Sequence, residues 1–230
     1  GVILCMAFGE QDWRTASRAS SGLAPRPEEE REAVVQVYAA RTFNWRGYFA
    51  VHTWIALKEK NAPSYTTYQV IGWYLGWKGT AVDIRQDTPD RFWYGAEPQL
   101  IEELRGEEAE KAIPQIKKLA ATYPYGKTYN AWPGPNSNTF ISYIVRNVPE
   151  LTVELPPHAI GKDWSPKLIE KSESGSGYQL TFYGLFGVTV GRAEGIEINI
   201  LGLNFGVDFY RPALKLPLFG RIGLKDEPLQ

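Results

Sequence analysis

The chain has almost no cysteine or histidine. Its 230 residues include one cysteine, Cys5, and two histidines, His52 and His158. A single cysteine cannot form an intrachain disulfide or a cysteine zinc cluster. The histidines and the scattered carboxylates show no metal-ligand spacing, and no phosphate-binding glycine motif leads into a helix. We therefore expect neither a metal nor a cofactor.

The chain also lacks an excess of charge of either sign. Lys and Arg number 25 against 26 for Asp and Glu, which gives a formal net charge of −1. Binding along a nucleic acid needs a basic face that neutralises several phosphates, and the sequence contains no basic run. We expect no nucleic-acid partner.

Long apolar runs are missing as well. A membrane-spanning helix needs about 20 apolar residues, and the apolar start of the chain, residues 1–8, is too short to cross. We interpret this start as the end of a signal or membrane anchor, with a lipid-modified Cys5 as an alternative. The sequence thus predicts an N-terminal lead-in over residues 1–32.

Hydrophobic and aromatic residues are abundant by contrast. They include 8 Trp, 13 Tyr and 10 Phe, and hydrophobic residues make up 43% of the chain. These values are typical of a globular protein with a core of its own, and aromatic residues favour strands. We predict an α+β core over residues 33–165 and a strand-rich extension packed on it over residues 166–230.

Strand signals recur in the first half of the predicted core. Residues 33–41, 48–57, 65–75 and 80–87 are rich in β-branched and aromatic side chains, and only short turns separate them. Connections this short favour an antiparallel meander. Two helices follow, one over residues 106–123 that Pro114 should kink or restart, and one from Asn136 or Ser137 to Arg146.

The extension alternates apolar and other residues, as strands do. Residues 178–190 and 196–208 predict a β-hairpin elaboration, and the alternation changes phase between Ile200 and Leu201. Such a change predicts a β-bulge. We expect the apolar side to pack on the core, and the alternative is that it faces a protein partner or a membrane.

Two positions could carry chemistry. His52 lies within a predicted strand, between Val51 and Thr53, whereas His158 falls in a proline-rich loop. Asn136, Ser137 and Asn138 lie where the second helix should begin, and Asn and Ser are preferred helix caps. A hydroxyl at a helix N-terminus also faces free backbone N–H groups that can stabilise an oxyanion. Ser137 is thus a candidate nucleophile, with His52 as its candidate base.

Four segments resemble a bacterial family of unknown function. They are VVQVYAAR (34–41), FAVHTWI (49–55), WPGPNSNTF (132–140) and AIGKD (159–163). More distantly, the order of strand histidine, helix and Asn-led helix start is similar to the circularly permuted papain-like fold of lecithin retinol acyltransferase and NlpC-type peptidases. That resemblance implies a histidine base at His52 and a nucleophile at Ser137, where the relatives have cysteine.

Serine ionises far less readily than cysteine, which weakens the catalytic interpretation. The first hypothesis is therefore a non-catalytic binding or accessory protein on a papain-like scaffold, membrane-associated or periplasmic in a bacterium, with a membrane protein or lipid as partner. The alternative is a serine-dependent acyl hydrolase or acyltransferase that uses Ser137 and His52. In either case we expect Trp54, Trp132, Asn136 and Asn138 to line the binding site.

Overall fold

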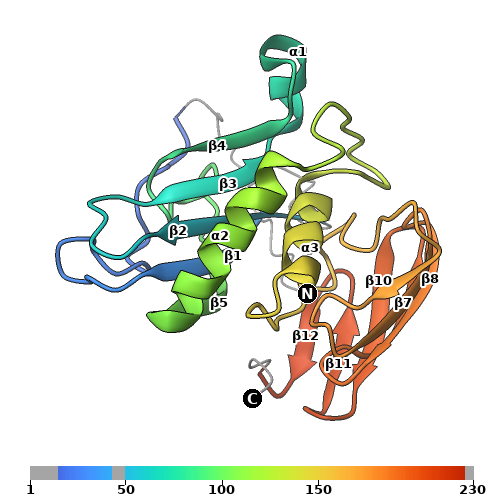
Figure 1. Cartoon of the computed structure of the whole chain (residues 1–230). Helices are drawn as coiled ribbons and strands as arrows, with labels where there is room; N and C mark the ends of the chain where they lie inside the picture. The colour runs from blue at the N-terminus through green and yellow to red at the C-terminus, as the bar shows by residue number, and fades with distance from the viewer. Residues whose placement is uncertain (1–14, 43–49, 226–230) are drawn as a thin grey trace, which may run out of the picture.

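Two antiparallel sheets and two longer helices make up the molecule (Figure 1). This computed structural model describes residues 15–42 and 50–225. The expected signal or anchor segment and Cys5 lie outside the described residues. The predicted α+β class is confirmed, with mostly antiparallel strands.

The first sheet has five strands in the order β4-β3-β2-β1-β5. Its strands are β1 (Val34–Arg41), β2 (Val51–Lys58), β3 (Thr66–Val70), β4 (Val82–Gln86) and β5 (Gln99–Arg105). The first four form the predicted meander. β5 was not predicted, and it pairs with the outer edge of β1. The third predicted strand is too long, because two short helices, η2 (Gly72–Tyr74) and α1 (Leu75–Lys78), follow β3.

Helices α2 (Glu107–Ala121) and α3 (Ser137–Asn147) cover one face of this sheet (Figure 1). The buried residues of α2 recur at helical spacing. They are Ala109, Ala112, Ile113, Ile116 and Ala120. The predicted restart at Pro114 is wrong, since α2 continues through that residue. Its apolar stripe extends on both sides of the proline, so packing on the sheet holds both halves in one helix.

The first sheet has an apolar cluster on each face. Val51, Ile55 and Leu57 belong to the cluster shared with α2 and α3. Trp54 and Ala56 belong to a second cluster on the opposite face, together with Trp93. Alternate residues of β2 therefore point to opposite faces of the sheet, as period-two geometry requires.

The C-terminal part forms a second sheet, a seven-stranded meander in the order β12-β11-β10-β9-β8-β7-β6. Its strands are β6 (Ile169–Lys171), β7 (Gly177–Phe182), β8 (Phe186–Gly191), β9 (Gly195–Ile200), β10 (Leu203–Asp208), β11 (Ala213–Leu216) and β12 (Gly220–Gly223). It is larger than the predicted hairpin. The predicted bulge after Ile200 is wrong. Leu201 and Gly202 form a tight turn with φ of 54° and 82°, and Ile200 pairs with Leu203 across it.

Candidate functional site

His52 is buried on the face of the first sheet that lies away from α2 and α3. Its ring stacks on Trp93 with centroids 3.7 Å apart, and its Nε2 lies 3.0 Å from Gln69 Oε1. The Gln69 amide nitrogen donates to Asp83, so Gln69 Oε1 faces the ring and His52 Nε2 must be the donor. Burial lowers the pKa of His52 to about 4 despite the bond to Gln69.

The side chains at the start of α3 form a buried network of hydrogen bonds. The Asn136 side chain accepts from the backbone N–H groups of Asn138 and Thr139, which forms the predicted N-cap. Asn138 donates to the carbonyls of Val51 and Ile160 and accepts from the Thr53 hydroxyl. These contacts join the helix to β2 and to the AIGKD segment.

The structure does not bring His52 and Ser137 together. Thr53 contacts α3 through Asn138, whereas its neighbour His52 points to the opposite face of β2. Proton transfer from a serine to a histidine needs a contact of about 3 Å, and His52 lies on the face of the sheet that α3 does not cover. The expected base therefore does not face the expected nucleophile. Ser137 is the first residue of α3 and is 8% exposed.

The two expected tryptophans also lie apart. Trp54 is 2% exposed, packs against Tyr38 and Trp93, and donates from Nε1 to the Pro89 carbonyl. Trp132 is 53% exposed, and its Nε1 donates to the carbonyl of Leu201 in the second sheet, 2.8 Å away. Trp54 is thus a core residue, and only Trp132 presents its ring at the surface.

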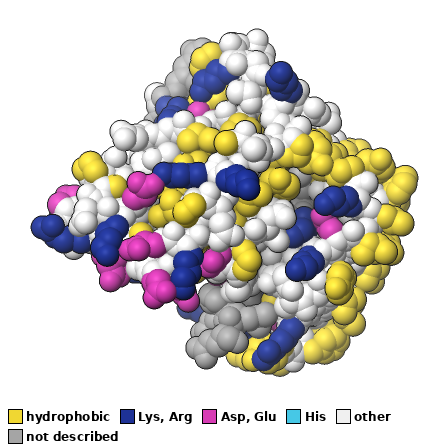
Figure 2. All heavy atoms as spheres, in the orientation of Figure 1, with side chains coloured by type: hydrophobic (Ala, Val, Ile, Leu, Met, Phe, Trp, Pro, Cys, Tyr) yellow, Lys and Arg dark blue, Asp and Glu magenta, His cyan; other side chains and the backbone are white. Residues whose placement is uncertain are grey.

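The outer face of the second sheet is apolar and exposed. Strand pairing joins Tyr178, Val190, Ile196, Val207, Leu214 and Ile222 into one row across the sheet. A second row contains Ile169, Leu180, Val188, Ile198 and Phe205. Each of these side chains is between 38% and 66% exposed. We call them the outer face, and in Figure 2 hydrophobic atoms gather along the side of the molecule where β7, β8 and β10 lie.

The expectation that these residues pack on the core is wrong, because the polar side of the sheet faces inward. Gln179, Thr189, Glu197 and Lys215 form a lateral row there and are at most 6% exposed. Gly206 interrupts that row between Glu197 and Lys215. A Cβ at this glycine would lie 2.9 Å from Glu197 Cγ, so the missing side chain leaves space for the long ones beside it.

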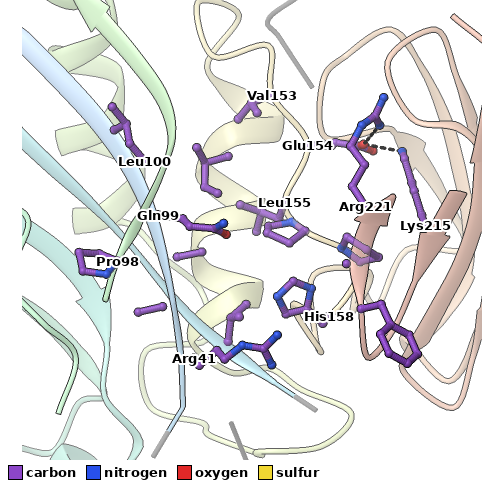
Figure 3. A pocket seen from close by; sticks show the side chains of 18 of the residues that line it. Arg41, Pro98, Gln99, Leu100, Val153, Glu154, Leu155, His158, Lys215 and Arg221 are labelled. Atoms are coloured by element: carbon purple, nitrogen blue, oxygen red, sulfur yellow. Dashed lines mark ion pairs between the residues drawn. The ribbon is translucent and has the colours of Figure 1, made fainter. Parts of the chain in front are cut away.

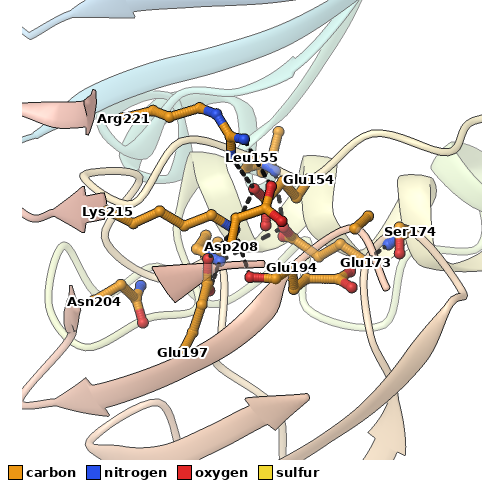
Figure 4. A network of polar contacts seen from close by, with 12 residues as sticks. Glu154, Leu155, Glu173, Ser174, Glu194, Glu197, Asn204, Asp208, Lys215 and Arg221 are labelled. Atoms are coloured by element: carbon orange, nitrogen blue, oxygen red, sulfur yellow. Dashed lines mark hydrogen bonds and ion pairs between the residues drawn. The ribbon is translucent and has the colours of Figure 1, made fainter. Parts of the chain in front are cut away.

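Charges buried under the second sheet join it to the AIGKD segment. Lys162 is 2% exposed, with Glu197 at 2.9 Å and Glu173 at 3.7 Å. Lys215 binds the opposite carboxylate oxygen of Glu197 at 3.0 Å and also pairs with Glu154 (Figure 4). Removing each ion from water costs free energy, and these close contacts offset that cost. The two lysines lower the pKa of Glu197 to about 2, although burial alone would raise it.

The exposed charges of the second sheet are all positive. In described residues 166–225, the acidic side chains Glu173, Glu194, Glu197 and Asp208 are at most 3% exposed, and Glu170 is half-buried. The basic residues Lys167, Lys171, Arg192 and Lys225 are exposed. Hence the outer face combines an apolar surface with a cationic rim.

A cavity of about 970 Å³ lies between the two sheets, lined by the end of β1, the loop around His158, and β12 (Figure 3). Burial and the charge of Arg41 lower the pKa of His158 to about 4. Glu154, Lys215 and Arg221 on its wall belong to the buried ion network. These three charges of the wall therefore already compensate one another within the protein.

Neither a metal cluster nor a membrane-spanning helix is found in the part of the chain that the structure describes. No three His, Cys, Asp or Glu side chains converge there on a common point that would hold a metal ion. No helix among the same residues is both long and apolar enough to cross a bilayer.

The sequence did not predict that the outer face points to the surface. The alternation at Ile196, Ile198 and Ile200 marked one apolar side without showing which way it points.

Comparison with known proteins identifies a family and no activity. Residues 32–164 match the model of a family described as protein of unknown function (DUF3750). The match ends at Trp164, directly after the AIGKD segment and before β6 of the second sheet. No curated protein and no solved structure matches the chain.

Proposed function

Since this chain belongs to the DUF3750 family of proteins of unknown function, we propose its function from the structure: a non-catalytic, peripheral membrane-binding protein that lies on anionic lipid through the outer face. One observation carries the proposal. A sheet that turns its polar side inward and its apolar side to the surface reverses the pattern of a water-exposed sheet.

The size of the outer face supports this function. Seven strands about 4.8 Å apart span about 29 Å, and a six-residue strand is about 20 Å long. The projected area is roughly 600 Å², at the upper end of the largest apolar patches that monomeric proteins expose. Covering that area would contribute on the order of 15 kcal/mol before the costs of binding are subtracted. A face of this size therefore favours a covered state.

The rim charges favour a bilayer over a second copy of the chain. Lys171 lies in the outer-face row beside Tyr178, and Arg192 and Lys225 lie at strand ends. Two copies packed face to face would bring cationic rims together without exposed acidic partners from described residues 166–225. A membrane with anionic headgroups attracts each such basic side chain by about 1 kcal/mol.

The two ends of the second sheet suggest an orientation. The loops after β6, β8 and β10 share one end, where Arg192 donates to the Tyr210 hydroxyl. The loops after β7, β9 and β11 share the other end and expose Tyr183, Leu201 and Phe219, the last at 70%. Phe209 and Tyr210 are exposed at the first end as well, so both ends offer aromatic side chains to the membrane, and we place the basic side chains of the first end among the headgroups. Lys167, near the apolar end, can snorkel to the interface.

Vesicle binding tests this proposal. The full chain should co-sediment with vesicles that contain phosphatidylglycerol, and more weakly with phosphatidylcholine alone. Ile198→Asp places a charge at the centre of the outer face and should weaken binding at least about tenfold. The matched control is Ile84→Asp on β4, because Ile84 is 43% exposed and Ile198 is 47% exposed. The control should bind as the wild type does.

Two results would contradict membrane binding. One is equal vesicle binding by Ile198→Asp and the wild type. The other is a stable dimer in analytical ultracentrifugation, with no vesicle binding, that Ile198→Asp converts to a monomer. The second result would make the outer face an interface between copies.

The permuted papain-like core stays a prediction. The order of strand histidine, helix α2 and the Asn136 cap of α3 supports it, and the face on which His52 lies counts against the catalytic form. Acyl hydrolysis by Ser137 would need a base other than His52. We therefore propose the scaffold for binding only, with Trp132 beside the apolar loop of Leu201 as a contact to lipid.

A further inference from the structure

A second, smaller cavity lies on the first sheet, on the face away from α2 and α3. Its volume is about 250 Å³. Arginines and aromatic rings dominate its lining: Arg18, Arg85, Arg91, Tyr74, Trp93 and Tyr94. Among the residues that the structure describes, none of those in the lining carries a carboxylate. We call this cavity the arginine pocket.

The ion pairs around the arginine pocket leave positive charge in excess. Asp87 binds Arg91 at 2.7 Å and Arg85 at 3.2 Å, so one carboxylate serves two guanidinium groups. Asp83 lies 3.4 Å from Arg85 and 3.0 Å from Lys78. Lys78, Arg85 and Arg91 thus share two carboxylates.

Of Arg85 and Arg91, Arg91 is the guanidinium that a bound anion would stabilise more. Its side chain is 13% exposed, whereas that of Arg85 is 39% exposed. Burial lowers the pKa of Arg91; the charge of Asp87 opposes this, and the neighbouring Arg85 adds to it. A buried cation beside a second cation is stabilised by a bound anion, and guanidinium groups hold phosphate through paired hydrogen bonds.

An exposed aromatic ring packs against the lining of the pocket, next to Tyr94. Trp73 is 59% exposed, and its ring lies 6.3 Å from that of Tyr94, edge to face. An aromatic face beside an anion site offers a flat apolar surface to the group that carries the anion. The volume lies below the roughly 300–1,000 Å³ of drug-sized sites, so a compact ligand fits best.

We propose that the arginine pocket binds a phosphate monoester carried on a sugar ring, with Arg85 and Arg91 on the phosphate and Trp73 against the ring. The site is independent of the outer face, which lies on the other sheet. It is therefore a binding activity beyond membrane attachment, and the failure of either proposal leaves the other standing.

Titration calorimetry on the full chain tests this site with glucose phosphate, inorganic phosphate, glucose and gluconate. Glucose phosphate should bind most tightly, inorganic phosphate more weakly, and glucose and gluconate at least about tenfold more weakly than glucose phosphate. Arg85→Gln should weaken glucose phosphate at least about tenfold. Trp73→Ala should remove the advantage of glucose phosphate over inorganic phosphate.

Arg105→Gln is the matched control. Arg105 is 44% exposed and pairs with Glu30 and Glu103 on β5, at the far edge of the same sheet. It should bind glucose phosphate as the wild type does. Equal loss in both arginine variants, gluconate as tight as glucose phosphate, or no heat with any phosphate would overturn the proposal.

The source of the phosphate is tested separately. Vesicles containing phosphatidic acid are mixed with Ile198→Asp, which lacks the intact outer face. Binding that is lost when Arg85→Gln is added would assign the pocket to a lipid headgroup and overturn the sugar. Absence of vesicle binding, together with tight glucose phosphate, supports a soluble ligand.

Discussion

At neutral pH the buried ring of His52 donates from Nε2 to Gln69 and stacks on Trp93. Burial holds its pKa near 4, below the usual 6.5. A base whose pKa is lower in the folded state contributes full stability above pH 6.5, and this contribution is lost as the pH falls toward 4. Acid should therefore destabilise the protein through this residue.

His52→Phe isolates that contribution because Phe cannot take up a proton. The free energies of unfolding of the wild type and the variant are measured in urea at pH 7, 5.5 and 4. The difference should shift in favour of the variant by on the order of 1–3 kcal/mol as the pH falls. A difference that stays constant with pH would show that the folded ring titrates near its ordinary pKa.

At the scale of the element, the start of α3 distinguishes a structural role from a catalytic one. Asn136 accepts two backbone N–H groups and donates to the carbonyls of Ala131 and Ile160. Asn136→Ala removes the cap, worth about 1 kcal/mol, and it takes the side-chain donor from the Ala131 carbonyl and one of the two side-chain donors from the Ile160 carbonyl. We expect a loss of roughly 2–4 kcal/mol in urea unfolding. Ser137→Ala is the neighbouring control and should change stability by less than about 1 kcal/mol.

The AIGKD segment depends on the same asparagine. Gly161 has φ of 95°, and a Cβ there would lie 2.3 Å from the Asn136 amide nitrogen. Glycine is required at this position both by the backbone conformation and by the close approach. If Ser137→Ala proved as destabilising as Asn136→Ala, the cap would not explain the helix start.

Local sequence patterns predicted the helices and strands better than they predicted the tertiary contacts of those elements. The stripe of α2, the Asn136 cap and the strands β1 and β2 depend on residues close in sequence, so the sequence alone was enough to predict them. β5 pairs with β1, whose residues lie 60 to 71 positions earlier, and no local signal marks that pairing. The period-two pattern of β9 shows that Ile196 and Ile198 share a side, but which side is covered depends on the rest of the fold.

The candidate site shows the same limit. His52 and Ser137 were linked by residue type and by their order in the chain. Neither of these two signals shows which face of β2 each residue occupies. In β2, where alternate residues face opposite sides, Thr53 faces α3 and His52 does not. The arginine pocket was missed because its residues come from four separate stretches of the chain and match no motif.

At the scale of the whole molecule, buried charge connects the two sheets. The AIGKD segment packs with the first core through Ala159 and reaches under the second sheet through Lys162. Asp163 accepts from the side chains of Asn199 and Asn204 in the same region. Because an apolar inner layer is replaced here by ions, the position of the second sheet depends on these pairs being complete.

Lys162→Met tests that dependence. The substitution leaves Glu197 with one cation in place of two. It also removes the lysine whose charge offsets the cost of burying the Glu173 carboxylate. Breaking a buried pair in this way typically costs 3–5 kcal/mol, so we expect a loss of about that size. Hydrogen exchange should show protection falling first in β9 and β11, while β1 and β2 keep their protection.

Lys167→Met, at an exposed lysine five positions later, is the control and should change neither the free energy of unfolding nor the exchange pattern. A loss below about 1 kcal/mol in Lys162→Met would mean that backbone pairing and the remaining polar contacts hold the second sheet, and that the ions compensate only their own burial.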